Sequence, residues 1–282
     1  MKKFLRTPKG TLTAIFGGLL LVAGTATGWS VVLPHVAAAI IGACGLELLA
    51  SMALQRKASW PTSALLSGAI VAFILAPETP VAQTVWIAGV ATASKYLVAT
   101  RRGHIFNPAA LALVMSIPLF ATGQSWWGAG GDMPWPFILL VLAGGVWIVD
   151  RINKFPLVLS FAAVYFGSFT AIALIQPAAA AEMFRAPFVQ SALFLALFML
   201  TDPPTSPGRY QEQVAFGALA GVTACVAQLA GVGQAYLLVG VLVSNGALAL
   251  WRITGTLRQP ARTLAQREAV GARAGVAMRD GV

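Results

Sequence analysis

Apolar runs of about membrane-spanning length recur along nearly the whole chain. Hydrophobic residues make up 58% of the 282 residues and charged residues 10%, with a mean hydropathy of +0.78. Soluble domains carry about 25% charged residues. An α-helix needs about 20 apolar residues to cross the roughly 30 Å hydrocarbon core of a bilayer. The sequence therefore predicts an all-α polytopic membrane protein.

Ten apolar segments are long enough to be membrane-embedded helices. They are Thr11–Gly28, Val31–Gln55, Thr62–Ala76, Val81–Ala99, Pro108–Phe120, Pro136–Val149, Pro156–Ile175, Pro187–Leu200, Gln213–Ala230 and Gln234–Leu250. The third, fifth and eighth are short for about 30 Å of hydrocarbon, so we expect broken helices there. We expect one transmembrane domain over 1–252. Over 253–282, few large apolar residues predict a basic, mobile cytoplasmic tail.

The basic residues indicate the orientation. With a cytoplasmic N-terminus, every Lys and Arg except Arg185 falls in a cytoplasmic segment, as the positive-inside rule requires. We therefore expect a bacterial cytoplasmic (inner) membrane protein with both termini in the cytoplasm. This sorting, with anionic lipid at the inner surface, explains the net charge of +10 without a nucleic-acid partner.

The chain lacks the residues for several redox and nucleotide sites of its own. Cys44 and Cys225 lie in separate segments without a CxxC motif, which excludes a four-cysteine iron–sulfur cluster within this chain. His35 and His104 fall near opposite faces, which excludes a bis-histidine haem. No Walker loop, HExxH or strand-linked GxGxxG occurs, and no metal site is expected.

Two polar loops interrupt the apolar pattern on the predicted cytoplasmic side. The first comprises SKYL over 94–97 and GHIFNPAA over 103–110, and the second reads TDPPTSP over 201–207. Non-helical backbone at membrane depth is tolerated where protein covers it or where it lines a cavity. Helix N-termini at such breaks direct partial positive charge inward. We expect either a cavity for a polar, planar or anionic ligand, or simple caps and turns.

Both loops carry signals for helix ends. Asn107 before Pro108 predicts a helix N-cap with proline at the first helical position. Ser206 before Pro207 predicts a similar start for the ninth segment. Asp202 before two prolines should end the eighth segment.

Other polar and aromatic residues have two interpretations. Glu47 lies inside the second segment, where ionisable residues are costly, and is either a packing carboxylate or a residue supporting a ligand or proton path. Trp126, Trp127 and Trp135 lie near the outer face, where an interfacial aromatic belt is favoured over an electron-relay role.

Two pairs of similar sequence segments predict an inverted repeat of five plus five helices. FILAPETP at 73–80 resembles FMLTDPPT at 198–205, and NPAALAL at 107–113 resembles NGALAL at 245–250. The copies fall five segments apart on opposite faces, as in inverted-repeat transporters.

On the residues FNPA at 106–109 and TDPPTSP at 201–207, the chain resembles the RnfD/NqrB family. This family comprises the RnfD proteins of Rnf electron-transport complexes and the NqrB proteins of the sodium-pumping NADH:quinone reductase. The similarity runs from about Ser63 to Arg252. It implies a ten-helix inverted repeat that carries flavins.

The resemblance implies a non-covalent flavin near the cytoplasmic side, either riboflavin or FMN. Family members also bind FMN through a threonine of an SGAT motif on the outer side. The corresponding loop here, ATGQSWWGAGGD at 121–132, lacks that motif, so we expect no covalent FMN and a short form of the family.

The resemblance makes Asn107 and Asp202 the principal flavin-binding candidates. An asparagine donates and accepts, whereas an ionised aspartate only accepts, which suits the ring N3–H or ribityl hydroxyls. The further candidates are Glu47, His104, Phe106, Thr205, Ser206 and Asn245. No catalytic residue is assigned.

The leading hypothesis is a flavin-binding subunit that relays electrons in a larger complex rather than a stand-alone enzyme. Its partners would be iron–sulfur, haem or nucleotide-binding subunits, or a quinone. The alternatives are a small-molecule or flavin transporter on the same scaffold, or a redox-inactive assembly subunit.

Overall fold

The computed structural model describes residues 2–55, 60–100, 103–130, 133 and 136–254. It divides into two compact units, Met1–Asn245 and Gly246–Val282. Most of the predicted cytoplasmic tail lies outside the described residues. The single domain over 1–252 remains a prediction.

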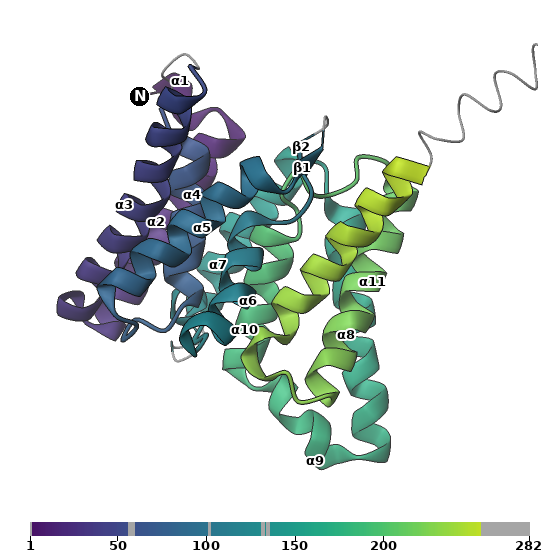
Figure 1. The fold of residues 1–282 in the computed structure, drawn as a ribbon. Helices are drawn as coiled ribbons and strands as arrows, with labels where there is room; N and C mark the ends of the chain where they lie inside the picture. The colour runs from purple at the N-terminus through teal and green to yellow at the C-terminus, as the bar shows by residue number, and fades with distance from the viewer. Residues whose placement is uncertain (1, 56–59, 101–102, 131–132, 134–135, 255–282) are drawn as a thin grey trace, which may run out of the picture. The chain divides into compact units, whose positions relative to one another are not determined.

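The helices follow the ten predicted segments (Figure 1). They are α2 (Pro8–Thr27), α3 (Trp29–Ala53), α4 (Thr62–Ile74), α5 (Val81–Leu97), α6 (Pro108–Phe120), α7 (Pro136–Arg151), α8 (Phe155–Ile175), α10 (Ala186–Phe194) with the π-helical turn η3 (Leu195–Met199), α11 (Tyr210–Leu229), and a last helical stretch, Gly233–Thr254.

The structure also contains short elements that the sequence did not predict. They are α1 (Lys2–Leu5), α9 (Pro177–Ala180), the 3-10 turns η1 (Trp127–Ala129), η2 (Ala181–Phe184) and η4 (Gly233–Ala235), and the strands β1 (Ala99–Thr100) and β2 (Gly103–His104). The two strands pair antiparallel, with Ala99 opposite His104. This hairpin leads directly into the first polar loop.

Five of the described helices are long and apolar enough to cross a membrane: α2, α3, α8, α11 and the last helical stretch. By contrast, α4 and α6 contain 13 residues each, which is about 20 Å at a rise of about 1.5 Å per residue. The fold is therefore an all-α, multi-pass membrane architecture. The expectation that the third and fifth segments form short helices is confirmed.

The ends of α4 and α6 continue as extended backbone, and the two extended segments pair with each other. Leu75 forms an antiparallel bridge with Gln124. The backbone N–H of Ala76 donates to the carbonyl of Gly123 at 3.1 Å, and that of Ser125 donates to Ile74 at 2.9 Å. These hydrogen bonds satisfy backbone polar groups within the protein, as non-helical backbone at membrane depth requires.

Glycines allow two helix pairs to pack closely: α3 beside α5, and α8 beside α11 (Figure 1). A Cβ added at Gly42 would overlap the carbonyl oxygen of Val85, and one at Gly217 would overlap that of Leu157. Small residues at such contacts let helix backbones approach in membranes. Each pair consists of the second and fourth predicted segments of one half of the chain. A five-plus-five repeat would give this arrangement, and the repeat itself remains a prediction.

The aromatic-belt interpretation is wrong for Trp126 and Trp127. Their exposed fractions are 3% and 7%. The indole N–H of Trp127 donates to the carbonyl of Ala72 at 2.6 Å, and that of Trp126 donates to Gln234 at 3.2 Å. The loop folds inward because both indoles find carbonyl partners among the helix ends. Trp135 lies outside the described residues.

The Gly42 contact predicts a position-specific effect within α3. Gly42→Ala should lower the thermal unfolding midpoint of the detergent-purified protein, because overpacking costs about 1–3 kcal/mol. Gly45→Ala, one turn away, is the control, since nothing lies within 4 Å of the added Cβ. It should leave the midpoint unchanged or raise it through helix propensity. Equal effects at both positions would contradict the packing described here.

Candidate ligand-binding cavity

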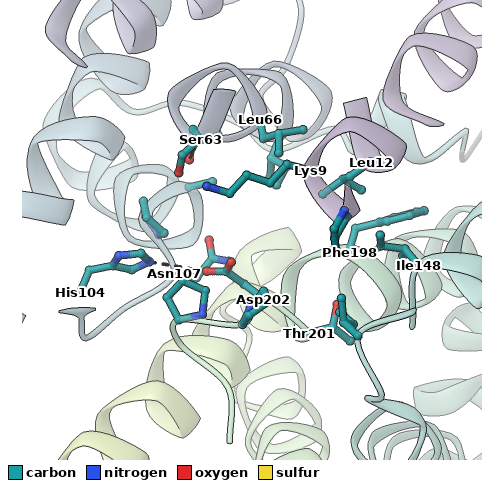
Figure 2. A pocket seen from close by; sticks show the side chains of 18 of the residues that line it. Lys9, Leu12, Ser63, Leu66, His104, Asn107, Ile148, Phe198, Thr201 and Asp202 are labelled. Atoms are coloured by element: carbon teal, nitrogen blue, oxygen red, sulfur yellow. Dashed lines mark hydrogen bonds and ion pairs between the residues drawn. The ribbon is translucent and has the colours of Figure 1, made fainter. Parts of the chain in front are cut away.

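The two polar loops meet at a cavity of about 570 Å³. Figure 2 shows His104 and Asn107 from the first loop and Thr201 and Asp202 from the second around this space. Loops separated by about ninety residues in the sequence thus contribute to one site. Its volume falls in the range of about 300–1,000 Å³ typical of small-molecule sites.

Most of the cavity wall is apolar. It includes side chains from α2, α4, α7, the turn after α7, and η3: Leu12, Leu66, Ile70, Ile148, Ile152, Leu197 and Phe198. Such a wall excludes water and accommodates a flat, apolar body, while a few polar groups fix its orientation.

Asn107 is the N-cap of α6, with Pro108 at the first helical position, as predicted. Its side-chain oxygen accepts from the Ala110 backbone N–H at 3.1 Å, and its amide donates to the Met199 carbonyl at 3.2 Å. Its own backbone N–H donates to Asn245 Oδ1 at 2.8 Å. Most of the hydrogen-bonding groups of Asn107 therefore bond to other parts of the protein. One hydrogen of its side-chain amide is left for a ligand.

Asn245 links the two loops. While its Oδ1 accepts from the backbone of Asn107, its Nδ2 donates to the carbonyl of Thr205 at 3.1 Å. The side chain is buried and does not line the cavity. Asn245 thus connects the two loops through hydrogen bonds. Its direct contact with a ligand remains a prediction.

A compact turn presents the Asp202 side chain. The Asp202 carbonyl accepts from the backbone N–H groups of Thr205 and Ser206 at 3.1 and 3.0 Å, and from the Ser206 hydroxyl at 2.8 Å. The Thr205 hydroxyl donates to Asp202 Oδ2 at 3.2 Å. Thr205 and Ser206 are buried and lie outside the cavity lining. Their described contacts shape the turn rather than the cavity surface.

The predicted helix start at Ser206 is wrong. The ninth segment begins as α11 at Tyr210, with Arg209 as its N-cap residue. The Ser206 hydroxyl instead donates backwards to Asp202. Serine side chains bond nearby backbone groups in turns as readily as they cap helices, so the local sequence allowed both outcomes.

His104 faces Asp202 across the cavity edge (Figure 2). His104 Nε2 lies 3.6 Å from Asp202 Oδ2, an ion-pair distance that is too long for a hydrogen bond. The Nε2 atom is buried and has no hydrogen-bond partner among the described residues. Buried polar atoms are normally paired, so this nitrogen is available to a bound molecule.

Two further candidates lie away from the cavity lining. Phe106 is half-buried in the first loop. Glu47 lies in α3, where its Oε1 accepts from the Tyr96 hydroxyl at 2.7 Å. This contact supports the packing interpretation of Glu47, and direct roles for both residues in ligand binding remain predictions.

Sequence reasoning did not name Lys9 or Ser63 as ligand-binding candidates, and it placed Lys95 in the first polar loop without making it a candidate. Lys95 Nζ donates to the backbone carbonyl and the hydroxyl of Ser63, at 3.0 and 3.2 Å. One signal was present, because Lys95 falls inside the predicted segment Val81–Ala99 and ionisable residues within membrane segments mark functional sites. Lys95 was counted toward the orientation and placed in the first polar loop.

The bridge through Asn245 predicts a stability effect. Asn245→Ala leaves the buried Asn107 N–H and Thr205 carbonyl without this partner, at about 1–3 kcal/mol for each unsatisfied group. The thermal unfolding midpoint of the purified protein should fall by several degrees. Ser244→Ala is the matched control, because that buried hydroxyl has no partner among the described residues. If Ser244→Ala lowered the unfolding midpoint by as much, the bridging role of Asn245 would be contradicted.

One comparison with known proteins gives a match. Residues 126–251 match the model of the NQR2, RnfD, RnfE family. The matched stretch contains the second polar loop and Asn245, and it begins after the first loop. No curated protein matches the chain. This stretch, less than half of the chain, is thus similar to the NQR2, RnfD, RnfE family.

Proposed function

We propose that this protein is a flavin-binding subunit that relays electrons within a complex of the bacterial cytoplasmic membrane. Both termini lie in the cytoplasm in this proposal, as the basic residues predict. The flavin sits non-covalently in the cavity between the two polar loops. The convergence of both loops on one cavity is the observation that carries the proposal.

The lining residues fit a flavin. Its ring system is planar, with apolar faces and a polar pyrimidine edge that both donates and accepts. Phe198 and Ile148 offer apolar surface to the faces. At the edge, Asp202 accepts from a ring N–H, while Asn107 Nδ2 and a protonated His104 Nε2 donate to carbonyl oxygens. The buried Nε2, which has no hydrogen-bond partner among the described residues, gains one in this arrangement.

The chain binds and orients the flavin and excludes water, while the flavin supplies the redox chemistry when bound. The partners that exchange electrons with it are iron–sulfur, haem or nucleotide-binding subunits, or a quinone. A covalent FMN is not part of the proposal, because the loop at 121–132 lacks the SGAT motif. Within that loop, Thr122 Oγ1 lies 2.6 Å from Ser116 Oγ in a hydroxyl pair.

An absorption spectrum of the detergent-purified protein tests the proposal. We expect flavin bands at near-stoichiometric occupancy, bleached by dithionite and released into the small-molecule fraction on denaturation. A well-folded, colourless protein would overturn the proposal. A bound solute without redox change that accumulates in vesicles would favour the transporter instead. Flavin that stays on the denatured chain would contradict non-covalent binding.

Asp202→Asn should reduce flavin occupancy while preserving side-chain size. A hydrogen bond to a charged group contributes about 1.5–3 kcal/mol, which corresponds to a loss of about tenfold or more in affinity. Asp150→Asn is the matched control, because that carboxylate is exposed near the end of α7 and outside the cavity. The two variants should differ in flavin fluorescence released per mole of protein. Equal flavin occupancy in the two variants would show that Asp202 does not bind the flavin.

A further inference from the structure

The N-terminal segment 4–9 forms one wall of the cavity. Its lining residues are Phe4, Thr7, Pro8 and Lys9. All four are exposed, whereas the wall that η3 contributes is buried within the fold. The N-terminal wall therefore lies at the surface of the first compact unit, where a small movement would open the cavity without disturbing the core.

A two-residue break joins this wall to the rest of α2. The helix α1 ends at Leu5 and α2 begins at Pro8, which has no backbone N–H with which to continue the first helix. The Thr7 side chain caps α2 by accepting from the Gly10 N–H at 3.1 Å, while the Thr7 N–H donates to the Phe4 carbonyl at 2.9 Å. Residues at the ends of helices commonly serve as hinges, so this break provides a pivot for α1.

Arg151, the last residue of α7, holds the segment from a separate helix. Its guanidinium donates to the backbone carbonyl of Arg6 and, at 3.0 Å, to the hydroxyl of Thr11. The Thr11 hydroxyl in turn donates to the Leu5 carbonyl at 3.0 Å. One arginine thus ties α1 and the start of α2 to α7. These hydrogen bonds are exposed, and regions held mainly by exposed hydrogen bonds open locally while the core stays folded.

We propose that the N-terminal segment is a movable wall that controls access to the cavity, and that Arg151 is the positioning residue that holds it closed. Release of Arg151 lets α1 pivot at the break and carries Phe4 away from the cavity. Ligand then enters and leaves beside α2 and α7. This inference rests on the cavity and does not depend on which molecule occupies it.

Chemical labelling of a thiol inside the cavity tests the wall directly. Ser67→Cys places the thiol at a buried lining position in α4, in protein that also carries Cys44→Ala and Cys225→Ala. A small, water-soluble methanethiosulfonate reagent should label it several-fold faster after Arg151→Gln. Arg6→Gln is the matched control, because it removes a nearby positive charge and keeps the carbonyl that accepts from Arg151. It should leave the labelling rate unchanged.

A second variant opens the wall without a change of charge. A Cβ added at Gly10 would overlap the backbone carbonyl of Phe4, so Gly10→Ala should push α1 away from α2 and speed labelling of the same thiol. Gly17→Ala, in the same helix, has nothing within 4 Å of the added Cβ and should not.

A general loosening of the fold is distinguished by a buried thiol outside the cavity. Cys225 is 4% exposed and does not line the cavity. As the single cysteine of a Cys44→Ala protein, it should react at the same rate with and without Arg151→Gln. Faster labelling of Cys225 as well would overturn the inference, as would an unchanged rate at the cavity thiol in both Arg151→Gln and Gly10→Ala. An equal acceleration in Arg6→Gln would exclude Arg151 as the residue that holds the wall.

Riboflavin kinetics separate this inference from the flavin proposal. A gate alters the rates of entry and exit together, whereas a residue that contacts the ligand alters affinity mainly through exit. Arg151→Gln should therefore speed riboflavin uptake and release by a similar factor, with affinity nearly unchanged. A lower affinity at an unchanged uptake rate would contradict the gate. Failure of any flavin to bind would overturn the flavin proposal, and the labelling experiment would still decide whether the wall moves.

Discussion

Every backbone polar group at membrane depth must find a partner within the protein, and the architecture of this chain depends on that constraint. Short helices break inside the fold, and each break described here is closed by specific hydrogen bonds. The ends of α4 and α6 pair with each other as extended segments. On the cavity side, Asn107 and Asn245 connect the first loop to the second. The cavity exists because these contacts hold the two breaks together.

The motif residues divide into two groups once the structure is known. Asn245, Thr205 and Ser206 bond the backbone of the loops and lie outside the cavity lining. His104 and Asp202 face the cavity and retain capacity for a ligand. Several of the motif residues therefore hold the loops that shape the cavity and do not line it. The cavity lining also includes charged residues outside these motifs, Lys9 and Lys95.

The sequence predicted the helices well because hydrophobic runs and proline signals are local. The bounds of α6 agree at both ends, since Asn107 before Pro108 permits one arrangement. The start of α11 was predicted wrongly because the Ser206 hydroxyl can either cap a following helix or bond to the backbone of the preceding turn. Burial of Trp126 and Trp127 depends on carbonyls of distant elements. The meeting of Lys9, Ser63 and Lys95 likewise joins three separate helices, which no local pattern encodes.

Hydrogen–deuterium exchange with and without FMN tests most directly whether the two loops form one ligand site. The account predicts that FMN slows exchange in both loops together, over 103–109 and 197–204, and in the first turn of α4. Asn245→Ala should raise exchange in both loops before any ligand is added. Protection confined to the outer segment 121–130, or to one loop alone, would contradict a shared cavity.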